Sequence, residues 1–169
     1  MKLSKLCPYL LLGAMLLGGC GAASGDSSVP ASETQVSTSK GAQKSVPEIY
    51  KDITDNVALI SPVEMQDEFI TNYYGIDPDV LEEYVFEMSE DATSAETVVI
   101  MKVKDAADVE NIKNALGVVI DEKRAEMENY LPEQFEIVDK SQVESKDNYV
   151  WLVISNNRDA ILELIEKDI

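Results

Sequence analysis

The chain has 169 residues, with 32 acidic against 14 basic side chains, a formal net charge of −18 and no histidine. Such an excess of negative charge argues against a nucleic-acid partner and against direct contact with anionic lipid. Without histidine, the chain has no Ser-His-Asp triad and no histidine-bound zinc. The sequence also has no phosphate-binding glycine loop and no G-x-S-x-G nucleophile motif.

The first 19 residues have the layout of a secretory signal peptide. Lys2 and Lys5 precede an apolar run at 10–17, which is shorter than the roughly 20 residues that a membrane-spanning helix needs. The run ends in Leu17-Gly18-Gly19-Cys20. A plain secretory signal with an incidental cysteine and an uncleaved N-terminal helix are the alternatives.

The segment that ends at Cys20 resembles the lipobox of bacterial lipoproteins, with an aliphatic residue, two small residues and a cysteine. The resemblance implies cleavage between Gly19 and Cys20, and acyl chains such as palmitate on the mature N-terminal cysteine. Two or more acyl chains anchor a protein stably in a bilayer. We therefore expect a lipid anchor in the cell membrane, with the rest of the chain on the extracytoplasmic side.

The remaining cysteine, Cys7, lies inside the predicted signal peptide, so the mature chain is expected to have no disulfide and no free thiol. Residues 20–45 join the acylated cysteine to a predicted flexible linker, because small and polar residues dominate and no apolar period appears. Residues 46–169 are enough for one globular domain. Removing Lys2 and Lys5 with the signal peptide lowers the net charge from −18 to −20, and this excess falls on the domain.

The domain begins with three predicted helical segments. Apolar residues repeat at intervals of three and four over 47–58, which indicates an amphipathic helix. Ser61-Pro62-Val63-Glu64 has the pattern of a capping box that starts a second helix, and Gly75 ends it. Asp77-Pro78 starts a short turn of helix that runs to Glu83.

The rest of the domain alternates predicted strands and helices. Strands are expected at 84–88, 97–103, 134–139 and 149–154, a long helix from Asp105 to about residue 129, and a last helix after Asn156 or Asn157. Paired neighbouring strands, with helices between and after them, indicate an α+β fold. We expect a mostly antiparallel four-stranded sheet with helices packed on one face.

Three segments of this domain carry a family resemblance: SAETVVIMKVKDAADVENIKNAL, ENYLPEQFEIVDKSQV and NYVWLVIS. YYGID, at 73–77, also fits. In this order they resemble a family of small Gram-positive lipoproteins catalogued as domain of unknown function 4358. One departure is Asp147-Asn148, where a glycine is expected before Tyr149, although asparagine can take the same left-handed turn geometry. The resemblance implies a fold and a surface location, and it supplies no activity and no catalytic residues.

Carboxylates are the candidate chemical groups of the domain. Asp77, Asp79, Glu82 and Glu83 form the densest cluster, but Leu81 stands where a calcium loop needs an oxygen ligand. We interpret these acids as a helix start and a solvated face, and we expect no metal site and no cofactor. Because two carboxylates suffice for glycoside hydrolysis, a carboxylate-dependent envelope enzyme such as a glycan hydrolase stays the alternative function.

The aromatic residues offer one candidate contact surface. Trp151 lies within the most hydrophobic predicted strand, so we expect it in the core. In the pair Tyr73-Tyr74, one ring is expected to be buried and the other partly exposed, and we choose Tyr74 as the contact residue. The sequence thus favours a membrane-anchored, non-enzymatic domain that binds an envelope protein or peptide. A solute receptor for a transporter normally needs two lobes, for which this domain is too short.

Overall fold

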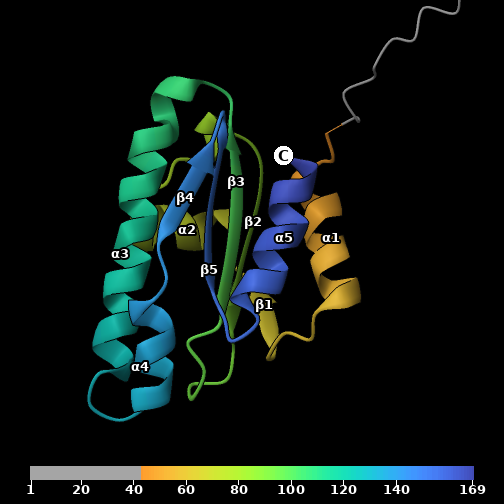
Figure 1. Ribbon diagram of the computed structural model, residues 1–169. Coiled ribbons are helices and arrows are strands. Elements are labelled where there is room, and N and C mark those ends of the chain that lie inside the picture. The colour runs from red at the N-terminus through yellow and green to blue at the C-terminus, as the bar shows by residue number, and fades with distance from the viewer. Residues whose placement is uncertain (1–42) are drawn as a thin grey trace, which may run out of the picture. The chain divides into compact units, whose positions relative to one another are not determined.

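The computed structural model describes residues 43–169, in which the chain forms five helices and five strands (Figure 1). In chain order these are α1 (Val46–Asn56), β1 (Pro62–Glu64), α2 (Asp67–Tyr74), β2 (Leu81–Ser89), β3 (Thr97–Val103), α3 (Val109–Met127), α4 (Pro132–Asp139), β4 (Val143–Lys146), β5 (Tyr149–Ile154) and α5 (Arg158–Asp168). Two short 3-10 turns precede β2 and α3, at Pro78–Val80 and Ala106–Asp108.

The strands form one antiparallel sheet in the order β1-β2-β3-β5-β4. The predicted α+β class is therefore confirmed, and the sheet has five strands where four were predicted. The central strand β3 is apolar at nearly every position, and six of its seven residues are buried. A strand with both faces buried carries such a continuous apolar run instead of an alternating one.

Helices cover both faces of the sheet, whereas the sequence analysis placed them on one face. Figure 1 shows α3 and α4 on one side of the sheet and α1 and α5 on the other. Val99 and Met101 of β3 pack in one cluster with α2, α3 and α4, and Val98 and Ile100 pack in a second cluster with α1 and α5. Successive side chains of a strand point to opposite faces. The unbroken apolar run of β3 thus requires a helical layer on each side.

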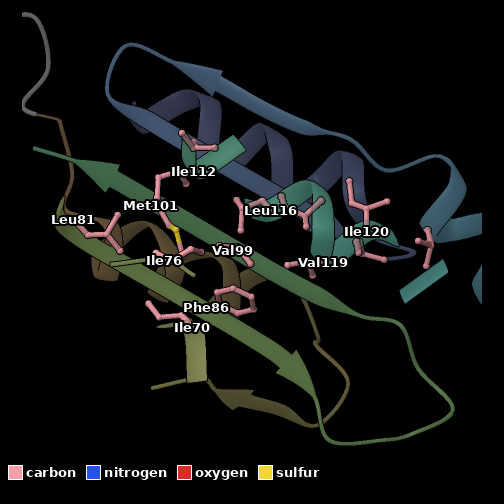
Figure 2. Close-up of a cluster of buried hydrophobic side chains, with 14 of the residues drawn as sticks. Ile70, Ile76, Leu81, Phe86, Val99, Met101, Ile112, Leu116, Val119 and Ile120 are labelled. Carbon is pink, nitrogen blue, oxygen red and sulfur yellow. The ribbon is translucent and has the colours of Figure 1, made fainter. Parts of the chain in front are cut away.

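The larger of the two cores lies between the sheet and α3 (Figure 2). Leu116 and Val119 of α3 are fully buried against Val99 and Met101 of the sheet, and Phe86 of β2 lies in the same cluster. Burying a side chain of this size stabilises the fold by about 1.5–3 kcal/mol. This core fixes α3 on the sheet and so positions the surface that α3 shares with α2.

Three predicted elements differ from the observed ones. The helical turn predicted to run from Asp77 to Glu83 ends at Val80, and Leu81 already begins β2. Within the predicted helix start at 61–64, Pro62–Glu64 form β1, because Val63 pairs with Met88 and the Met65 amide donates to the Phe86 carbonyl at 2.7 Å. Residues 134–139 belong to α4 rather than to a strand. Pro132 both follows α3 and takes the first position of α4, and Val138 is buried beneath that helix.

Strand β4, which was not predicted, pairs with β5 through a tight turn at Asp147-Asn148. Asp147 takes the left-handed conformation, with φ 51°, where the sequence analysis gave that role to asparagine. The Asn148 side chain instead donates to the Val103 carbonyl at 3.2 Å. The long predicted helix is confirmed as α3, and Gly75 ends α2 in the left-handed conformation, with φ 65°.

Candidate functional site

The candidate site is a group of aromatic, apolar and acidic side chains on α2 and the adjoining side of α3. Two rings of α2 are stacked, since the centroids of Phe69 and Tyr73 lie 4.6 Å apart at an interplanar angle of 27°. Tyr74 stacks on Phe86 at 5.5 Å and meets Phe69 edge-on at 5.8 Å. Such contacts contribute about 0.5–1.5 kcal/mol beyond the burial of their area. The cluster therefore holds the rings in fixed positions.

The side of α3 that faces this cluster carries Glu122, which together with burial of the ring raises the pKa of Tyr74. Glu126 lies one turn further along α3 and also acts on Tyr74 electrostatically. Val118 lies one turn before Glu122 on the same helix face, and 43% of its surface is exposed. We call Phe69, Tyr73, Tyr74, Val118, Glu122 and Glu126 the α2–α3 face.

The electrostatic character of the α2–α3 face is negative. Burial, together with the neighbouring Glu122 carboxylate, raises the pKa of Tyr74, so this phenol stays neutral. Glu126 pairs with Lys123 at 2.9 Å, whereas Glu122 takes part in no ion pair among the described residues. Helix α2 itself carries Asp67 and Glu68 and has no lysine or arginine. The exposed Tyr73 ring therefore lies on a face with several carboxylates, of which Glu122 has no ion-pair partner among the described residues.

The tyrosine pair divides into one packed and one exposed ring. Tyr74, the contact residue chosen from the sequence, is half-buried in the core cluster, while Tyr73 is 65% exposed. Tyr74 as a contact residue stays a prediction, and its hydroxyl is the part of the side chain that lies next to Glu122. Sequence reasoning missed Phe69, although its spacing of four from Tyr73 on a helix is the signal that identifies the stack.

Trp151 lies in the core, as predicted, next to a partly buried ion pair between Glu144 and Arg158. Its indole Nε1 donates to Glu144 Oε2 at 3.0 Å, and Arg158 Nη2 donates to Glu144 Oε1 at 2.5 Å. Glu144 and Glu166 line a hollow of about 590 Å³ beside β4. Because both Glu144 oxygens already have donors, this carboxylate has a structural role in the fold.

The predicted acidic cluster separates into unrelated contacts. Asp77 accepts from the Asp79 amide at 2.9 Å, Glu82 pairs with Lys102 at 2.9 Å, and Glu83 accepts from the Val46 amide at 2.6 Å. Within residues 43–169, no group of three or more acidic, cysteine or histidine side chains is arranged to hold a metal ion. These acids cap a turn and connect elements.

An acidic pair, Glu64 and Glu87, lies on the face of the sheet opposite the α2–α3 face. Glu87 of β2 is the direct cross-strand partner of Glu64 of β1, and the Tyr50 hydroxyl of α1 lies near Glu87. Burial and the Glu64 charge raise the pKa of Glu87. A carboxyl group with a raised pKa beside a second carboxylate is an arrangement that a glycosidase can use. Here, however, Glu87 borders a hollow of only about 10 Å³, which accepts a water molecule and excludes a sugar ring.

The predicted cleavage and acylation positions, Gly19 and Cys20, lie outside the described residues. In the described part of the chain, no helix is long and apolar enough to cross a membrane.

The comparisons with known proteins identify one family. The model of the family described as domain of unknown function (DUF4358) matches residues 49–155. This range runs from α1 to the end of β5 and includes the α2–α3 face. No curated protein matches the chain, and no solved structure does.

Proposed function

The chain belongs to the family of domain of unknown function 4358, and on this premise we propose that it is a membrane-anchored, extracytoplasmic binding domain without catalytic activity. In this proposal Cys20 carries the acyl anchor and residues 20–45 are the linker. The α2–α3 face contacts an envelope protein or peptide. The observation that carries the binding role is the exposed Tyr73 ring, fixed by its stack on Phe69.

A large exposed aromatic ring with a fixed orientation is typical of a binding hot spot. Tyrosine is enriched at such positions because it supplies contact area at a small cost in conformational entropy. The stack on Phe69 orders the Tyr73 ring before a partner arrives. A ring needed only for folding would lie in the core, as Phe86 does.

The linker enters the domain away from the α2–α3 face. Lys44, near the start of the described chain, pairs with Asp52 of α1 and, at 2.9 Å, with Asp168 of α5. Both helices cover the face of the sheet opposite α3. The sheet therefore separates the linker entry from the proposed contact surface, and a lipid-anchored domain keeps that surface accessible.

The anchor is tested by changing Cys20 to serine in the producing bacterium. We expect the wild-type protein in the membrane fraction, with acyl chains detected by mass spectrometry on a peptide that begins at residue 20. The C20S protein is expected to lack them. Recovery of an unacylated wild-type chain that begins elsewhere would overturn this half of the proposal.

The binding role is tested by placing a photoreactive amino acid at position 73 of the full-length protein in living cells. We expect a reproducible crosslink to one envelope protein. Uniform, weak crosslinks from every exposed position would count against a dedicated contact surface.

A further inference from the structure

The α2–α3 face combines an open aromatic ring with carboxylates, and this combination determines which partner chemistry it fits. We propose that the face takes a basic segment of a partner protein, with a lysine or arginine side chain on the exposed ring of Tyr73 and its charge directed to Glu122. The inference rests on the proposed binding function and specifies the partner's chemistry.

The domain already contains such an arrangement within its own fold. Lys102 Nζ lies 5.6 Å from the centroid of the Tyr149 ring, and the same ammonium pairs with Glu82 at 2.9 Å. A cation within about 6 Å of a tyrosine ring is attracted by the ring's negative face. The α2–α3 face supplies the ring and the carboxylates, and among the described residues no lysine or arginine is placed over the Tyr73 ring.

The ring of Tyr73 is open and held in place. One side of Tyr73 stacks on Phe69, and the residue as a whole is 65% exposed. Val118 adds an exposed apolar surface on α3. A basic side chain can therefore cover Tyr73 with its methylene stem while its charge stays near carboxylates, as amphipathic side chains do.

The charge of the neighbouring residues favours the same occupant. Glu122 has no basic partner among the described side chains, whereas Lys123 already neutralises part of the charge of Glu126. Asp67 and Glu68 lie on the same short helix as Tyr73. The chain as a whole carries −18. This field attracts a basic segment at long range and repels an acidic one.

The test uses the full-length chain in zwitterionic detergent and three synthetic peptides of equal length. The peptides share their leucines and one photoreactive residue, and their other positions are all lysine, all glutamine or all glutamate. At low salt we expect the lysine peptide to reach half-maximal crosslinking at a concentration about tenfold lower than the glutamine peptide. The crosslinked residues are expected in α2 and in 115–126 of α3.

Matched variants separate this site from general attraction to an acidic protein. Glu122→Gln keeps the size and polarity of the side chain and removes one charge, so we expect it to weaken binding of the lysine peptide severalfold. Tyr73→Leu keeps an apolar side chain and removes the ring, with an expected loss of about threefold to fivefold. Glu163→Gln on α5, in the opposite layer, removes an exposed carboxylate and is expected to change nothing.

Each other outcome overturns the inference in a distinguishable way. Equal binding of the lysine and glutamine peptides would indicate an apolar site, and the binding function would stand. Equal weakening by Glu122→Gln and Glu163→Gln would indicate attraction without a site. Failure of the lysine peptide to bind would also refute the inference that the face takes a basic segment. If the photoreactive residue at position 73 still captures a protein in cells, and Glu122→Gln leaves that capture unchanged, only the basic chemistry of the partner is wrong.

Discussion

Glu64 and Glu87 are direct cross-strand partners on β1 and β2, so two carboxyl groups meet at the edge of the sheet. Like charges at directly opposed positions destabilise a strand pair. Burial together with the Glu64 charge raises the pKa of Glu87 above its ordinary value of 4.5, although the nearby Tyr50 hydroxyl acts to lower it. The native fold therefore favours a proton on Glu87.

This relationship predicts how stability depends on pH. Because the folded pKa of Glu87 lies above the unfolded one, its contribution to stability is fully present below the unfolded pKa. That contribution is lost as the pH rises through the folded pKa. Glu87→Gln keeps the size and polarity of the side chain and removes the charge. At neutral pH we expect it to raise the free energy of unfolding by about 0.5 kcal/mol, and the gain should vanish in acid.

The measurement for Glu87 is urea unfolding of both proteins from below pH 4.5 to pH 7. Glu90→Gln removes an exposed carboxylate just beyond β2 and is the control, with no such trend expected. If the stability gain of Glu87→Gln over the wild type were largest in acid, that result would contradict a raised pKa for Glu87.

Because Tyr73 is assigned to binding and Phe86 to folding, we expect their substitutions to reduce the free energy of unfolding by different amounts. Phe86→Ala creates a cavity in the larger core and is expected to cost about 3–5 kcal/mol. Tyr73→Ala removes an exposed ring and its stack, with an expected cost of about 1 kcal/mol or less. Denaturant unfolding of both variants measures the difference. A Tyr73→Ala protein as unstable as the Phe86→Ala protein would assign Tyr73 to folding instead of binding.

The ion pair between Glu144 and Arg158 predicts a structural effect. Glu144→Gln leaves the partly buried Arg158 guanidinium without its counter-charge and keeps an acceptor for the Trp151 indole. We expect a loss of about 1–3 kcal/mol in the free energy of unfolding. The single tryptophan makes fluorescence a direct reporter. Glu166→Gln, in the same hollow, is the control, and an equal loss there would refute a specific role of Glu144.

The turn between β4 and β5 predicts one stabilising substitution. Asp147 has a φ of 51°, which glycine adopts at little cost, so Asp147→Gly is expected to add about 0.5 kcal/mol. Asn148→Gly removes the side-chain hydrogen bond to the Val103 carbonyl and is expected to reduce stability. Thermal unfolding of the two variants measures both effects. If Asn148→Gly unfolded at a higher temperature than Asp147→Gly, the assignment of the left-handed position to residue 147 would be wrong.

Local patterns predicted much of the fold, and they failed where distant pairing decides the structure. The helical period of 109–127 and the β-rich runs of β3 and β5 were correctly interpreted. Residues 61–64 carry a helix-start pattern, yet pairing of Val63 with Met88 makes them a strand. The alternation of Phe135 and Ile137 resembles a strand, while the burial of Val138 beneath α4 follows a helical period.

The candidate site was only partly visible in the sequence. The pair Tyr73-Tyr74 marks its position, and the spacing of Phe69 and Tyr73 on one helix predicts their stack. The contact of Tyr74 with Glu122 joins two helices that are far apart in the chain. Only the packing of α2 and α3 on the same side of the sheet brings these residues together, and a single sequence contains no signal for it.

Crosslinking from position 73 in living cells, compared with position 130, tests the central claim most directly. Tyr130 is 85% exposed, lies beyond the end of α3 and belongs to no aromatic stack among the described residues, so it is the matched control. We predict a single envelope protein captured from position 73, and little or none of it from position 130. Equal capture from both positions, or none from position 73, would contradict a binding role for the α2–α3 face.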